Sequence, residues 1–180
     1  MSKQVTLKDK SFKIFIEESV ILDAIAKVGS KISEDLKNEQ PIFICVLNGS
    51  FLFAADLMKN VSIPCHISFI KLSSYHGGTQ SSGTVNEVIG LYENIEGRTV
   101  VILEDIIDTG NTIEKLHAIL MPKNPGKLLI ASLLYKPDAY KKQIPIDYVG
   151  IEVPNNFLVG YGLDYDGLGR NLRDIYILMD

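Results

Sequence analysis

Short apolar runs with hardly any polar residue are the feature that most constrains the fold of this chain. The clearest are Ile42–Leu47 and Thr99–Leu103. Strands of this kind are apolar on both faces, as in a parallel sheet that helices cover on both sides. They are far too short to cross a bilayer, which takes about 20 residues. They therefore predict the buried central strands of an α/β protein.

Amphipathic helical patterns alternate with these runs. A first helix is predicted by apolar residues at helical spacing, namely Ile21, Ile25, Val28, Ile32 and Leu36. A second is predicted to follow the turn Asn48-Gly49-Ser50 and to extend to about Met58. A third is predicted from Thr112 until Pro122 stops it. Strands that alternate with helices imply a mostly parallel sheet with helices on both faces.

The remaining segments fit this arrangement. A loop with no apolar periodicity is expected at 73–84, and the last thirty residues are expected to be mostly irregular. Further strands are expected at 12–15, 64–71, 85–91, 127–134, 148–151 and 175–179. In such sheets ligands bind at the carboxyl ends of the strands, so residues that follow different strands are expected to converge there.

Composition narrows the classes of function. The 180 residues have a net charge of −4 and a pI near 5.4, which argues against broad electrostatic binding to nucleic acid or to anionic membranes. Cys45 and Cys65 lie in apolar runs and are expected to pack in the interior. The three histidines lack metal-ligand spacing. The N-terminal stretch has no apolar signal-peptide core, so a cytoplasmic protein is expected.

The segment from Val100 to Thr112 contains the most informative chemistry. An apolar strand leads into Glu104 and Asp105, a third acid follows at Asp108, and small hydroxyl and glycine residues then lead into a helix. Such a turn offers backbone N–H groups, hydroxyls and a helix dipole to a phosphate. The adjacent carboxylates suit ribose hydroxyls or a divalent cation. The alternative is that these acids only cap a helix.

This segment resembles the phosphoribosyl pyrophosphate signature of type I phosphoribosyltransferases, and in particular the hypoxanthine-guanine branch. Further motifs occur in the same order along the chain: Val46–Ser50, Ser74-Tyr75, Leu133–Lys136, Val159–Asp164 and Arg170. The resemblance implies a single domain, 1–180, with the type I fold. Its core would span about 18–135, and a small hood would be built from about 1–17 and 136–180. A flexible active-site loop would complete it.

The resemblance also implies an activity in purine salvage. Hypoxanthine and guanine would react with phosphoribosyl pyrophosphate to give IMP and GMP, releasing pyrophosphate with the help of Mg²⁺. A homodimer or homotetramer is expected, with no nucleic-acid or membrane partner. Two alternatives stay open: a non-catalytic regulator of the same fold that senses phosphoribosyl pyrophosphate, and a receiver-like phosphoacceptor domain. The acidic pI weighs against a regulator that binds nucleic acid.

The family roles imply a ribose-phosphate site around the three acids. Asp108 would be the catalytic residue, near N7 of the base. The residues implied to bind the ribose and the 5′-phosphate are Glu104, Asp105, Asp108, Thr109, Gly110, Asn111 and Thr112. The implied metal ligands are Glu104, Asp105 and Asp164.

The pyrophosphate would be bound by Leu47, Asn48, Gly49 and Arg170. In the family the peptide between the first two of these positions is often cis, and a basic residue is common where this chain has Asn48. Asn48-Gly49 taken alone would indicate a plain turn.

The resemblance also implies a lid and a purine site. Ser74 and Tyr75 would close over the sugar, although a Gly/Ser-rich segment taken alone indicates a surface loop. The purine would be bound by Lys136, Phe157, Leu158 and Asp164. Without the resemblance, Lys136 would be a strand-end lysine that reaches solvent, and the other three would indicate packing or a turn.

Overall fold

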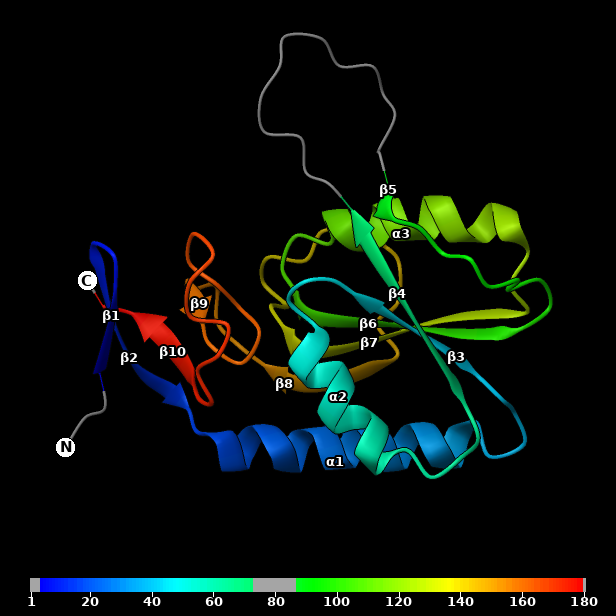
Figure 1. The fold of residues 1–180 in the computed structure, drawn as a ribbon, viewed down its shortest axis with the longest axis horizontal. Coiled ribbons are helices and arrows are strands. Elements are labelled where there is room, and N and C mark those ends of the chain that lie inside the picture. The colour runs from blue at the N-terminus through cyan, green and yellow to red at the C-terminus, as the bar shows by residue number, and fades with distance from the viewer. Residues whose placement is uncertain (1–3, 73–86, 180) are drawn as a thin grey trace, which may run out of the picture.

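The larger of two sheets forms the centre of the molecule (Figure 1). The structure is a computed structural model that describes residues 4–72 and 87–179. The strand order in this larger sheet is β5-β4-β3-β6-β7-β8. The strands are β3 (Ile42–Val46), β4 (His66–Leu72), β5 (Glu87–Ile89), β6 (Thr99–Ile107), β7 (Lys127–Tyr135) and β8 (Tyr148–Glu152). All pairings are parallel except that of β5 with β4, which confirms the mostly parallel sheet.

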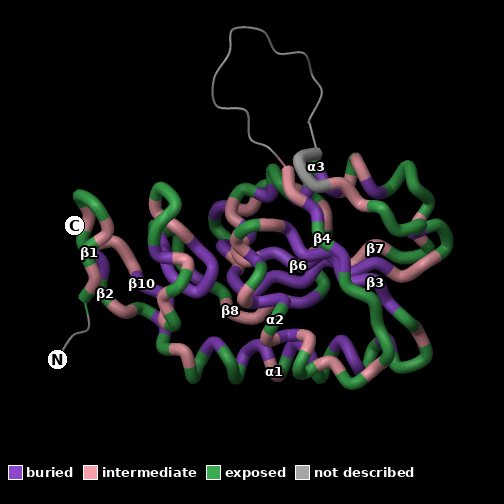
Figure 2. Tube along the Cα trace, viewed as in Figure 1, coloured by how far each residue is buried: buried purple, intermediate pink, exposed green. Residues whose placement is uncertain are grey.

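Helices cover both faces of this sheet, as the alternating sequence pattern predicts. Helices α1 (Glu18–Asp35) and α2 (Phe51–Asn60) lie on one face, and α3 (Asn111–Leu120) lies on the other, followed by a short 3₁₀ helix, η1 (Met121–Lys123). The fully buried strand β3 supplies Phe43 and Cys45 to the first face and Ile42 and Ile44 to the second. Figure 2 shows the resulting buried layer between the helices.

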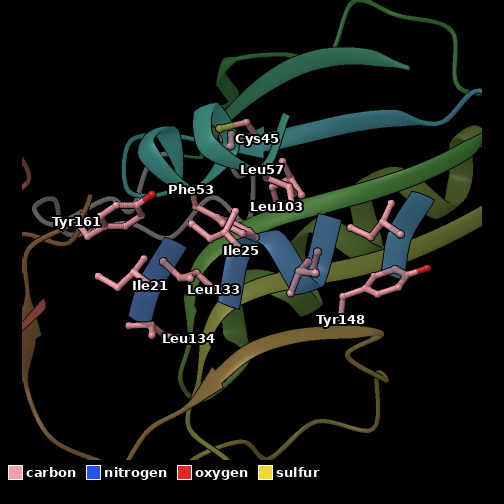
Figure 3. Close-up of a cluster of buried hydrophobic side chains, with 14 of the residues drawn as sticks. Ile21, Ile25, Cys45, Phe53, Leu57, Leu103, Leu133, Leu134, Tyr148 and Tyr161 are labelled. Carbon is pink, nitrogen blue, oxygen red and sulfur yellow. The ribbon is translucent and has the colours of Figure 1, made fainter. Parts of the chain in front are cut away.

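The core on the α1 and α2 face joins both helices to the sheet. Ile21 and Ile25 of α1 belong to the same buried cluster as Phe53 of α2 and Leu103 of β6 (Figure 3). Helix α1 begins at Glu18, one turn earlier than its apolar pattern indicates. The N–H of Glu18 donates to Asp174 Oδ1 at 2.9 Å, so a carboxylate from the far end of the chain accepts one N–H of its first turn.

The second sheet is built from both ends of the chain. Its antiparallel strands are β1 (Gln4–Leu7), β2 (Lys10–Ile16), β10 (Ile175–Leu178) and β9 (Leu158–Val159), in that order. The apolar pattern predicts a strand at 12–15 and misses β1 and β9. Neither has a local signal, because β1 is only half-buried and β9 has two residues.

Strand β6 continues beyond the point at which the sequence indicates its end. Its apolar run stops at Leu103, but pairing with β7 continues through Glu104 and on to Ile107. The two acids therefore lie within a strand, because a neighbouring strand supplies hydrogen bonds that a local pattern cannot reveal.

Three further expectations meet the described structure only in part. Cys45 is buried as expected, whereas Cys65, just before β4, is exposed. The resemblance implies a hood that includes about 136–180; within this range the strand expected at 148–151 is present as β8, which pairs in parallel with β7 in the larger sheet. The loop expected at 73–84 lies outside the described residues, as do the first two residues of the strand expected at 85–91. Among the described helices, none is long and apolar enough to cross a membrane.

The packing of α1 leads to a stability prediction. Ile25 is fully buried, whereas Leu22 on the same helix is 39% exposed. Ile25→Ala should lower the free energy of unfolding by about 2–5 kcal/mol, because it removes buried methyl groups and leaves a cavity. Leu22→Ala should change it by less than about 1 kcal/mol. Denaturant titration of both variants measures this, and equal losses would contradict the described packing.

Candidate active site

The carboxyl ends of β3 and β6 and the start of α3 enclose a hollow of about 330 Å³. Its lining includes Leu47, Gly49, Glu104, Asp105, Thr112 and Lys115. A second hollow, of about 90 Å³, lies beside it and is lined by Glu104, the segment 106–112 and Ile113. Residues that the sequence places far apart are thus brought together where the sheet topology predicts a ligand site.

Glu104 and Asp105 form a carboxylate pair in low-dielectric surroundings. Glu104 is 5% exposed, and no donor among the described residues contacts its buried Oε1. Burial raises the pKa of Glu104 well above its usual range, and the adjacent Asp105 adds to this. Burial also raises the pKa of Asp105 to about 6, although the N–H of Ile106 donates to its Oδ1 at 2.8 Å. The pair therefore favours a cationic or hydroxyl-bearing partner.

This pair fits a hard divalent cation. Mg²⁺ prefers oxygen ligands and is usually held by one or two carboxylates together with water and substrate phosphates. The unpartnered Oε1 of Glu104 and the carboxylate of Asp105 supply such oxygens. In the described part of the chain no group of three or more acidic, histidine or cysteine side chains gathers, so an all-protein metal cage is not present there.

The turn after β3 passes directly over Asp105. A Cβ atom at Gly49 would lie 1.6 Å from Asp105 Oδ2, so only glycine allows this close approach. The peptide between Leu47 and Asn48 is cis, as the resemblance implies. The Ser50 hydroxyl donates to the carbonyl of Val46 at 2.7 Å and so holds the turn from within. The turn is thus a built feature of the site, and the side chain of Asn48 is exposed.

Lys136 and Asp108 form an ion pair at the ends of β7 and β6. Lys136 Nζ donates to Asp108 Oδ2 at 2.8 Å. The side chain of Lys136 is 9% exposed and that of Asp108 is 44% exposed. The sequence alone indicates a lysine that reaches solvent, whereas the structure places it in the interior with an acidic partner. A buried cation that faces an open carboxylate can also bind a ligand oxygen.

The loop between Asp108 and α3 has the features of an anion site. Gly110 precedes α3 with a φ of 84°, and the first turn of the helix has no side-chain cap. Its N–H groups and dipole therefore favour a phosphate at this end of the helix. The acids of β6 do not cap α3, so the capping alternative is wrong. Thr109, Asn111 and Thr112 are exposed here.

The segment 157–170 supplies the remaining candidates. Arg170 Nη2 pairs with Asp164 Oδ1 at 2.6 Å, and both charges lie within electrostatic range of Asp105, where Arg170 lowers its pKa and Asp164 raises it. Phe157 is 44% exposed and rests against Phe12, with ring centroids 6.3 Å apart. Leu158 is buried in β9.

Two residues of interest were missed by the sequence analysis, and two predicted ones cannot be placed. Lys115 lines the larger hollow and lies one turn along α3 from Thr112, a spacing that could have indicated a shared face. Tyr161 is buried inside the motif Val159–Asp164, but no local pattern shows where its hydroxyl points. Ser74 and Tyr75 lie outside the described residues.

Comparison with known proteins settles the family. The sequence profile of the phosphoribosyl transferase domain matches residues 16–166. A hypoxanthine-guanine phosphoribosyltransferase of Streptococcus pyogenes is 40% identical over 168 residues, which cover 93% of each chain. This chain belongs to the hypoxanthine-guanine phosphoribosyltransferase family.

Solved structures agree with this assignment. A hypoxanthine-guanine phosphoribosyltransferase of Bacillus anthracis superposes with a TM-score of 0.84 at 34% identity, covering 93% of this chain and 96% of that one. A variant of the Trypanosoma cruzi hypoxanthine phosphoribosyltransferase, solved as a ternary substrates complex, gives 0.86 at 36% identity, covering 96% and 97%. The chain therefore has the type I fold and is a purine-salvage transferase. None of these relatives is a regulator or a receiver domain.

The close approach of Gly49 to Asp105 leads to a prediction for this family member. Gly49→Ala should lower transferase turnover by about 100-fold or more, because the added methyl must displace either the turn or the carboxylate by well over an ångström. Gly97→Ala is the control for turnover, since nothing lies within 4 Å of a Cβ there; its φ of +67° disfavours alanine, so this variant should melt at a lower temperature and keep near-normal turnover. Steady-state kinetics and thermal melting of both variants test this, and near-normal turnover in Gly49→Ala would contradict it.

Proposed function

We propose that this chain transfers the phosphoribosyl group of phosphoribosyl pyrophosphate to N9 of hypoxanthine and guanine. The products are IMP or GMP and pyrophosphate. The observation that best supports a 6-oxopurine acceptor is the buried Lys136 paired with Asp108 at the head of the anion-binding loop. This observation supports the proposal because the pair offers a donor and an acceptor to a purine edge, next to the loop that we propose binds the phosphate.

The ribose phosphate is proposed to bind along β6 and the start of α3. Glu104 and Asp105 accept hydrogen bonds from the ribose hydroxyls. The 5′-phosphate lies in the loop formed by Asp108, Thr109, Gly110, Asn111 and Thr112. Fixing the sugar at both ends orients its C1 atom toward the purine, and such positioning contributes much of the catalysis in transfers of this kind.

The purine is proposed to lie between Phe157 and the Lys136–Asp108 pair. Lys136 donates to the exocyclic O6, and the backbone at Leu158 meets the base edge. As the bond from N9 to C1 forms and the bond from C1 to pyrophosphate breaks, the proton on N7 of the purine passes to the Asp108 carboxylate. Asp108 accepts the hydrogen bond at N7 and stabilises the charge that develops there. Adenine would present an amino donor to the Lys136 donor, which disfavours it.

The pyrophosphate is proposed to bind at the Leu47-Asn48-Gly49 turn and near Arg170. Because Asn48 is uncharged, backbone N–H groups of the turn and the Arg170 guanidinium provide the protein's contacts. Glu104 and Asp105 would hold Mg²⁺ at the ribose, and Asp164 would be a second, separate Mg²⁺ ligand beside the base. Bound Mg²⁺ would neutralise charge on the departing pyrophosphate.

Three wider features belong to the same proposal. The chain acts as one catalytic domain, since the two sheets share a buried cluster that joins Tyr161 and Ile175 to Phe53 and Leu103. We also propose a cytoplasmic location and a homodimer or homotetramer, as the sequence resemblance implies.

The experiment that tests the function is a comparison of four bases. With Mg²⁺ and phosphoribosyl pyrophosphate present, pyrophosphate release should occur with hypoxanthine and guanine and should be at least about 100-fold slower with adenine, which lacks the oxygen that Lys136 binds. Xanthine completes the set. Absence of release with every base, despite binding of phosphoribosyl pyrophosphate, would overturn the proposal.

Removing the Lys136 side chain should weaken the binding of the purine much more than the binding of phosphoribosyl pyrophosphate. Lys136→Ala is expected to raise the KM for hypoxanthine by about 10-fold or more, because a buried charge-assisted hydrogen bond to O6 is lost. The KM for phosphoribosyl pyrophosphate should change by less than about 3-fold. Lys127→Ala, at the opposite end of the same strand, is the control. An unchanged KM for hypoxanthine would remove Lys136 from the purine site.

A further inference from the structure

Tyr161 joins the segment that leads from β9 to β10 with the helix behind the pyrophosphate turn. Its ring is 3% exposed within the core on the α1 and α2 face, where Figure 3 shows it with Phe53. Its hydroxyl donates to Asp56 Oδ2 on α2, and Lys59 Nζ donates to the other oxygen, Oδ1, at 2.6 Å. Both oxygens of Asp56 thus have partners, and the tyrosine reaches α2 from 105 residues away in the sequence.

The residue after Tyr161 rests directly on the pyrophosphate turn. A Cβ at Gly162 would lie 2.0 Å from the carbonyl oxygen of Gly49, and its φ of +97° also requires glycine. The Gly162 carbonyl accepts from Arg170 Nη1 at 2.6 Å, and its N–H donates to the Arg170 carbonyl at 3.0 Å. The backbone of Gly162 is therefore fixed between Arg170 and the turn.

The turn is consequently held from two directions. Helix α2 begins at Phe51, directly after the turn, and Gly162 packs against Gly49 from the other side. On its remaining side Gly49 faces Asp105. The Tyr161–Asp56 hydrogen bond ties the segment that contains Gly162 to α2. The turn, α2 and this segment are therefore each in contact with the other two.

We propose that Tyr161 and Asp56 are positioning residues that fix the pyrophosphate turn in place beside the carboxylate pair. They touch no reacting atom; they act through Gly162 and Gly49. The inference rests on the proposed function for its kinetic consequence. Burial, followed by the Asp56 carboxylate, raises the pKa of Tyr161, so its hydroxyl keeps its proton over the working pH range.

The first test uses the ligand-free protein. Tyr161→Phe removes the hydroxyl and keeps the ring, so the buried core stays filled. Hydrogen exchange of a peptide covering residues 46–51 should become about 10-fold faster in this variant. Tyr176→Phe is the matched control, because its hydroxyl also contacts an aspartate, Asp174 at 3.5 Å, without reaching the turn. The control should leave exchange at 46–51 unchanged.

The second test is kinetic. Tyr161→Phe should raise the KM for phosphoribosyl pyrophosphate and the inhibition constant of pyrophosphate by about 10-fold each. The kcat should change by less than about 3-fold, and Tyr176→Phe should alter neither constant. Asp56→Asn keeps an oxygen acceptor for Tyr161 and should lie between wild type and Asp56→Ala. If Tyr161→Phe fails to fold, the two Asp56 variants test the positioning role in its place.

The outcomes separate the two proposals. A lower melting temperature for Tyr161→Phe with unchanged exchange at 46–51 and unchanged KM would overturn the positioning role and leave only packing. Equal effects of Asp56→Asn and Asp56→Ala would also overturn it. If the wild-type protein releases no pyrophosphate with any base, the proposed function fails, whereas the exchange measurement still decides whether the contact fixes the turn.

Discussion

The adjacent carboxylates of Glu104 and Asp105 are the constraint on which the rest of this site depends. They occupy the interior of strand β6, where burial disfavours their charged forms and Glu104 Oε1 has no donor among the described residues. Such a pair is costly unless ligand hydroxyls or a cation compensate it when bound. Around it lie the uncapped first turn of α3, the Gly49 turn and the Arg170 guanidinium, groups that favour anionic oxygens.

Close packing of backbone makes this arrangement possible. Asp105, Gly49 and Gly162 lie in consecutive contact, and a single methyl group at either glycine would collide with its neighbour. A side chain therefore cannot be added at these points without moving the turn or the carboxylate. This packing couples the larger sheet to the segment that returns toward β10.

The layers and the main site motifs could be predicted from sequence because their signals are local. Apolar runs such as Ile42–Leu47 identify buried strands, the helical spacing from Ile21 to Leu36 identifies α1, and the order Glu104, Asp105, Asp108 identifies the loop before α3. Signals that depend on a distant partner were missed. Strand β6 continues past Leu103 because β7 pairs with it. Helix α1 begins at Glu18, whose N–H donates to the distant Asp174.

The sequence by itself determined the fold class and the position of the acids and of the glycine loop before α3, because periodicity and short motifs are properties of neighbouring residues. Only the tertiary structure decided how far each of these side chains is buried and which partner it contacts. It paired Lys136 with Asp108, left an oxygen of Glu104 without a donor, and brought Tyr161 to Asp56. The physical reason is that burial and hydrogen bonding depend on residues that are far apart in the chain and meet only when the sheets and helices pack together.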